Sequence, residues 1–299
     1  MIKKSIAVAR ESCFFMSVSI SFLEPLAKTL LEFLRDTPVF LVMAFFIVWV
    51  GCWLPLVAIL AITFKWQIHK SLQPQQKIPA LVSLYLLVPL ILWLFQWLKL
   101  GSLSDYGLVG EVSLLVSLCL GLGLGIFSLG IVFFGQICAG WCYLENSNIK
   151  LIPPILLTIS LVALFVGGIE ELIFRGFLLT QLEKSFSVWL AAVISSLIFA
   201  VLHLVWEQKE TLPQLPGLWL MGMVLVLARL ADGNNLGMAW GLHAGWVWAI
   251  ATIDTAGLIT YTDKVPQWLT GINKKPLAGL TGIICVLATG GVLLWVYLS

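Results

Sequence analysis

Four residues whose types could do chemistry lie inside long apolar stretches of this chain. Glu170 and Glu171 are adjacent, and two of the three histidines, His203 and His243, lie in later apolar stretches. A charged side chain near the centre of a bilayer costs about 2.5–3.5 kcal/mol on insertion scales. Ionisable groups at that depth usually face the interior of a helix bundle or a water-filled cavity, and they mark function. The combination of carboxylate and imidazole predicts acid–base activation of a water molecule.

The adjacent glutamates are predicted to have different roles. Neighbouring residues of a helix point about 100° apart, so the two carboxylates do not face the same direction. Glu171 and Arg175 have the i,i+4 spacing of an ion pair, which would offset much of the cost of burying both charges. Glu170 is then free to point into a cavity, where desolvation favours the neutral acid and suits it to proton transfer. We therefore expect Glu170 to be catalytic and the other two residues to support it.

Two of the histidines complete the predicted site. Phe199 lies one helical turn before His203 and on the same face, where its ring would limit the access of water. His243 is surrounded by small residues and tryptophans, and the small residues would permit the close approach of a neighbouring helix or a substrate. A lone histidine in a membrane helix can also serve only as a hydrogen-bonding link between helices. The third histidine, His69, lies in a polar linker and is expected to be solvated.

The same residues are candidate metal ligands. Two histidines and one glutamate are a known catalytic ligand set for Zn²⁺, so Glu170, His203 and His243 would hold the ion if a metal is used. The compact HExxH signature is absent from the sequence. A metal-free mechanism, in which the glutamate is the base, is equally compatible with these residues. The six cysteines are scattered, mostly in apolar runs, and are expected to be buried small side chains rather than a zinc site.

The composition predicts an all-α polytopic membrane protein. Of 299 residues, 60% are hydrophobic and 11% are charged, whereas soluble domains have about 45–50% and about 25%. The apolar runs are long and continuous rather than alternating, which favours helices over a barrel. The net charge of +2 and the lack of a basic stripe give no reason to expect a nucleic-acid partner.

The chain is predicted to have two parts. Residues 1–36 alternate charged and apolar side chains in their second half, as an amphipathic helix lying in the membrane interface does. Residues 37–299 form one transmembrane domain, with the chemistry concentrated in 150–255. About eight spanning helices are expected, because eight stretches are long and apolar enough. They are 38–64, 78–100, 112–137, 151–182, 187–206, 213–231, 236–257 and 277–298.

Three motifs in chain order resemble those of the CPBP family of membrane proteins. They are Glu170-Glu171-Leu-Ile-Phe-Arg175, then Phe199-Ala-Val-Leu-His203, then a motif that starts at His243. That family covers the type II CAAX prenyl proteases, the bacteriocin-processing and self-immunity proteins, and the abortive-infection-like membrane proteins. The resemblance implies an intramembrane endopeptidase acting on a membrane-bound or prenylated protein. It also implies that Glu170 and His203 activate the attacking water, and that His243 stabilises the oxyanion.

The third motif departs from the family pattern. The family usually has an asparagine four residues after the histidine, and here that position is Val247, which has no donor. Trp246, Asn234 or Asn235 would be substitutes. Loss of one oxyanion donor costs about 10²–10³ in rate, so a non-catalytic scaffold or immunity protein that binds a membrane partner is the alternative. A small transporter or proton relay is a third possibility.

The expected surroundings follow from the same reading. Membrane lipid and a membrane-bound or prenylated peptide are the expected partners, and the oligomeric state is left open. The protein is expected in a plasma or inner membrane, or in a thylakoid or plastid membrane. The lysines and arginines divide almost evenly between the two sides, so the orientation is not predicted.

Overall fold

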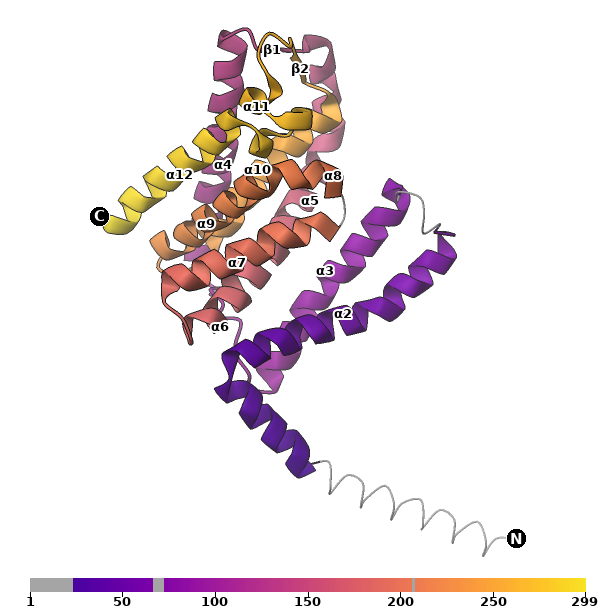
Figure 1. The fold of residues 1–299 in the computed structure, drawn as a ribbon, viewed down its shortest axis with the longest axis vertical. Helices are drawn as coiled ribbons and strands as arrows, with labels where there is room; N and C mark the ends of the chain where they lie inside the picture. The colour runs from indigo at the N-terminus through magenta and orange to yellow at the C-terminus, as the bar shows by residue number, and fades with distance from the viewer. Residues whose placement is uncertain (1–23, 67–72, 206–207) are drawn as a thin grey trace, which may run out of the picture.

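The computed structural model describes residues 24–66, 73–205 and 208–299 (Figure 1). These residues are predominantly helical. A hairpin of α2 (Pro38–Thr63) and α3 (Pro74–Trp97) leans away from the remaining helices, as Figure 1 shows. The bundle beside it contains, among others, α4 (Val112–Cys138), α5 (Ile152–Glu171), α7 (Val188–Leu202), α9 (Leu215–Ala231), α10 (Gly237–Ala256) and α12 (Leu280–Leu298).

The prediction of an all-α polytopic membrane protein is confirmed. Within the described residues, seven helices are long and apolar enough to cross a membrane. The seventh predicted span, 236–257, forms helix α10 (Gly237–Ala256), which does not meet that criterion. Its sequence contains three glycines, three tryptophans, His243 and Asp254. The prediction of about eight spans is therefore close to the seven helices that qualify by length and composition among the described residues.

The interior position of α10 explains its polar composition. All three of its tryptophans donate their indole N–H to a neighbouring helix: Trp240 to the carbonyl of Leu164 at 2.8 Å, Trp246 to Ser128 at 2.9 Å and Trp248 to Ser160 at 3.0 Å. A helix that faces other helices rather than lipid can carry such groups, because its neighbours satisfy their hydrogen bonds.

The contact between α10 and α4 is a seam of backbone against backbone. A Cβ atom built on Gly241 would lie 2.0 Å from the carbonyl oxygen of Leu118, and one built on Gly121 would lie 2.3 Å from that of Met238. Glycines at helical spacing let two membrane helices approach this closely. Gly121 and Gly125 of α4 therefore form a packing surface for α10.

Two features of the fold differ from the expected helices. The predicted span 151–182 is α5 followed by a π-helical segment, η2 (Leu172–Leu178), and the short helix α6 (Leu179–Glu183). Two short strands, β1 (Cys142–Leu144) and β2 (Ile259–Tyr261), pair antiparallel outside the predicted spans.

The predicted N-terminal segment is only partly described. Residues 1–23 lie outside the described residues, as does His69. Residues 24–36 are helical, and Leu26 and Leu30 are exposed there. The placement of this segment in the membrane interface remains a prediction.

The glycine seam gives a stability prediction. Gly241→Ala should lower the stability by about 1–3 kcal/mol, as overpacking of a close contact does. The reason is that its Cβ would meet backbone atoms that cannot move aside. The measurement is the thermal unfolding midpoint of the purified protein in detergent.

Gly123→Ala is the matched control, since nothing lies within 4 Å of a Cβ built there. This variant should be neutral or slightly stabilised, because alanine favours a helix more than glycine does. Equal unfolding midpoints for Gly241→Ala and the parent protein would contradict the seam.

Candidate active site

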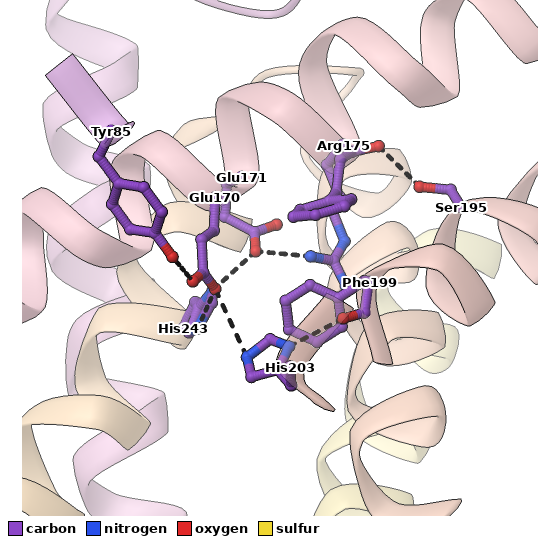
Figure 2. Close-up of polar contacts among 9 residues, drawn as sticks. Tyr85, Glu170, Glu171, Arg175, Ser195, Phe199, His203 and His243 are labelled. Carbon is purple, nitrogen blue, oxygen red and sulfur yellow. Dashed lines mark hydrogen bonds and ion pairs between the residues drawn. The ribbon is translucent and has the colours of Figure 1, made fainter. Parts of the chain in front are cut away.

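Three residues on three helices converge at the predicted site (Figure 2). Glu170 lies in the last turn of α5, His203 follows the end of α7, and His243 lies in the middle of α10. The Nε2 atom of His243 lies 3.6 Å from Oε2 of Glu170, and that of His203 lies 4.0 Å from the same oxygen. One carboxylate oxygen therefore faces both imidazoles, at distances beyond a direct hydrogen bond.

Glu171 supports the site from the protein interior. Its Oε1 accepts a hydrogen bond from Nη1 of Arg175 at 2.8 Å, so the ion pair expected from the i,i+4 spacing is present. The same oxygen contacts Nδ1 of His243 at 2.7 Å. Both side chains of the ion pair are fully buried. Removal of either charge would therefore leave the other buried without a partner.

Phe199 contacts both Arg175 and His203. Its ring lies 4.4 Å from the guanidinium carbon of Arg175, a cation–π contact, and its centroid lies 4.6 Å from that of the His203 ring. Its backbone carbonyl accepts a hydrogen bond from Nδ1 of His203 at 2.8 Å. The residue is fully buried, so it closes the wall behind His203.

The hydrogen bonds orient both imidazole rings in the same sense. A backbone carbonyl only accepts, so Nδ1 of His203 carries the proton in its contact with Phe199. The Glu171 carboxylate likewise accepts from Nδ1 of His243. In each neutral ring, Nε2 is then an acceptor, and both Nε2 atoms face Glu170. A water molecule there can donate one hydrogen to the carboxylate and the other to one of the two Nε2 atoms.

A fourth group at the site was missed by the sequence reasoning. Tyr85 of α3 donates its hydroxyl hydrogen bond to Oε1 of Glu170, and Figure 2 shows the ring directed at this carboxylate. Its only signal in the sequence is a phenol hydroxyl group in a mostly apolar span. Because Tyr85 precedes Glu170 by 85 residues, no helical spacing connects the two.

The catalytic candidates lie where two cavities meet. A cavity of about 390 Å³ lies between the α2–α3 hairpin and helices α5 and α7, and its lining includes Glu170 and His203. A second cavity, of about 620 Å³, is lined by His203, His243 and Val247 among residues of α9, α10 and α12. Aromatic and aliphatic side chains make up most of both linings. An extended chain could therefore reach Glu170 and the histidines from either cavity.

None of the three expected substitutes for the missing asparagine is available at the site. The indole N–H of Trp246 already donates to Ser128. The side chain of Asn235 accepts a hydrogen bond from the N–H of Gly237, the first residue of α10. Asn234 has a positive φ of 68° in the same turn. At a rise of about 1.5 Å per residue, this turn lies about 12 Å along the axis from His243.

The predicted metal ligands have suitable donor atoms but a wide spacing. The buried Oε2 of Glu170 accepts no hydrogen bond from any described residue, and both imidazoles present Nε2 toward it. Two ligands of a tetrahedral zinc ion, at about 2.0–2.1 Å from the metal, lie about 3.3 Å apart. Here the distances are 3.6 and 4.0 Å. Among the described residues, no group of three or more His, Cys, Asp or Glu side chains could hold a metal as they stand.

Comparison with known proteins identifies the region that carries these residues. Residues 152–249 match a family model described as type II CAAX prenyl endopeptidase Rce1-like. An uncharacterized 24.3 kDa protein of Escherichia coli is 33% identical over 89 residues, which are 29% of this chain and 40% of that protein. No solved structure matches. The match to the family model confirms the resemblance to the CPBP membrane proteases that the motifs predicted.

The buried ion pair gives a second stability prediction. Arg175→Met should destabilise the protein by about 3–5 kcal/mol, because the charge of Glu171 then stays buried without its cation. Adding Glu171→Leu should restore part of this loss, since a pair of apolar side chains avoids the uncompensated charge. Lys184→Met, at an exposed position after α6, is the matched control. A parent-like unfolding midpoint for Arg175→Met alone would contradict the role of the pair.

Proposed function

We propose that this protein is an intramembrane endopeptidase that hydrolyses a peptide bond of a membrane-associated or lipidated protein. The observation that carries the proposal is the convergence of Glu170, His203 and His243 at the boundary of two cavities. The match of residues 152–249 to a prenyl-endopeptidase family model supports the class of reaction. The helices that are apolar enough to span a membrane make it an integral membrane protein.

The mechanism follows from which atoms face one another. A water molecule between Oε2 of Glu170 and Nε2 of His203 gives a proton to the carboxylate as its oxygen attacks the peptide carbonyl. His243 acts in this step in its imidazolium form, with a proton on Nε2 as well as on Nδ1. It donates through Nε2 to the oxyanion while Glu171 accepts from Nδ1. When the C–N bond breaks, Glu170 returns the proton to the leaving amine. The water oxygen then belongs to the new carboxyl group, and the carboxylate of Glu170 is regenerated.

The cavity walls support the proposed substrate class. Trp49, Trp53 and Val50 line one cavity, and Leu129, Leu218 and Met221 line the other. Such walls bind apolar side chains or a lipid group better than a polar loop of a soluble protein. A CAAX-like lipidated C-terminus and a spanning segment both have this chemistry. The membrane that holds the enzyme, whether a plasma, inner, thylakoid or plastid membrane, stays a prediction.

Removal of the base or of its partner should abolish cleavage. Glu170→Gln and His203→Ala should each lower kcat by about 10²–10⁴, the usual contribution of general acid–base catalysis. The assay uses purified protein in proteoliposomes with a fluorogenic lipidated peptide. Glu111→Gln, a similar change at an exposed position before α4, should retain full activity. Parent-like rates in both site variants would end the proposal.

Metal analysis of the same samples distinguishes the two chemical routes. We propose the metal-free route, because the ligand distances are wider than those of a zinc site. The purified protein should then cleave with substoichiometric metal and should retain its rate in the presence of a chelator. One bound zinc per chain together with chelator-sensitive cleavage would assign the metal route to Glu170, His203 and His243.

Val247 favours a second candidate function, a non-catalytic membrane scaffold or immunity-type protein. It lies one helical turn after His243 and lines the same cavity, where an asparagine side chain would reach toward the oxyanion. If the protein is an enzyme that lacks this donor, Val247→Asn should raise kcat by at least about 10-fold, since one such donor contributes about 10²–10³. Val247→Leu is the control of similar size. Absence of cleavage by the parent and by Val247→Asn would favour the scaffold.

A further inference from the structure

The proposed base has a hydrogen-bond partner outside the region that matches the protease family. Tyr85 lies on α3, whereas the matched region begins at residue 152. Its hydroxyl donates to Oε1 of Glu170, and its side chain is 8% exposed. Both residues line the cavity between the α2–α3 hairpin and α5, so the contact lies on the wall of the proposed active site.

The surrounding contacts hold the tyrosine in this position. The indole N–H of Trp49 donates to the carbonyl of Leu84 at 2.8 Å, which links α2 to α3 next to Tyr85. The Tyr85 ring packs against Phe165 of α5, with ring centroids 6.3 Å apart. The hydroxyl group itself adds nothing to this packing, because a phenylalanine ring would fill the same space. A buried phenol needs a hydrogen-bond partner, and here that partner is Glu170.

The hydrogen bond divides the work of the two carboxylate oxygens. Oε1 of Glu170 is occupied by Tyr85, whereas Oε2 faces Nε2 of His203 and of His243. The terminal torsion of a glutamate is broad and has no strong preferred value. Without the tyrosine, the carboxylate could therefore rotate and present neither oxygen squarely to the histidines.

We propose that Tyr85 is a positioning residue of the active site, which fixes the rotation of the Glu170 carboxylate so that Oε2 faces both histidines. This inference rests on the proposed endopeptidase function. It adds the α2–α3 hairpin to the machinery, since that hairpin supplies the hydroxyl. Helix α3 would then contribute to the reaction although it lies outside the matched region.

The test removes only the hydroxyl. Tyr85→Phe, prepared as the full chain in proteoliposomes, should lower kcat for the fluorogenic lipidated peptide by about 10–100-fold. That range corresponds to one hydrogen bond to a charged group. KM should stay within about twofold, because the hydroxyl points at the base rather than at the bound chain. A parent-like kcat, or an effect confined to KM, would overturn the proposal.

A second readout does not depend on activity. The difference in infrared absorption between the parent and Glu170→Gln isolates the carboxylate stretch of Glu170. Tyr85→Phe should shift this band, because the carboxylate loses its hydrogen bond. A band unchanged in Tyr85→Phe would overturn the positioning role even if the rate fell.

Tyr106 offers a matched control. It is also a buried tyrosine, but it lies before α4, its ring packs on Phe177 and it lines neither cavity. Burial raises the pKa of its hydroxyl to about 12, so the group stays protonated throughout the assay. Tyr106→Phe should leave both kcat and the Glu170 band unchanged. An equal loss of kcat in Tyr106→Phe and Tyr85→Phe would indicate a general effect of removing buried hydroxyls and would overturn the proposal.

The two proposals fail in different ways. If Glu170→Gln and Tyr85→Phe both cleave at the parent rate, the endopeptidase mechanism is wrong. If Glu170→Gln is inactive while Tyr85→Phe cleaves at the parent rate, the mechanism stands and only the positioning role is wrong.

Discussion

The fold around the site depends on one shared oxygen atom. Oε1 of Glu171 contacts both Arg175 and His243, so a single buried carboxylate joins the π-helical segment after α5 to the central helix α10. Arg175 in turn lies over the ring of Phe199, whose carbonyl orients His203. Charges at this depth are tolerated only when they satisfy one another. The requirement that makes the cluster stable therefore also directs both imidazoles toward Glu170.

The sequence predicted the parts of the site that depend on spacing within one helix. The ion pair of Glu171 and Arg175 follows from i,i+4 geometry, and Phe199 and His203 share a face for the same reason. The three motifs lie on separate helices, so their convergence followed only from the cost of isolated polar groups in lipid and from the family resemblance. The all-α membrane architecture followed from composition and from the length of the apolar runs.

Other features depend on contacts that no local pattern contains. Tyr85 donates a hydrogen bond to Glu170, which lies 85 residues later in the chain. The indole N–H of Trp246 donates to Ser128 on α4. The polar groups of helix α10 have partners on α4 and α5, and its own sequence does not name those partners. The β1–β2 pair joins segments that lie more than a hundred residues apart in the chain. Each strand has only three residues, which is too short for an alternation of apolar and polar side chains to be recognised.

The backbone seam between α4 and α10 also determines how freely this protein can change its sequence. Where a side chain contacts another side chain, a new rotamer or a compensating substitution can absorb a change, but two backbones in contact offer neither. At Gly121, Gly125, Gly241 and Gly245, an added Cβ would lie within 2.6 Å of a carbonyl oxygen of the facing helix. Gly123 and Gly130, in the same helix as the first two, meet nothing within 4 Å. Mutational tolerance along α4 should therefore alternate with the helical repeat, strict on the side that holds the helix of His243 and permissive on the other.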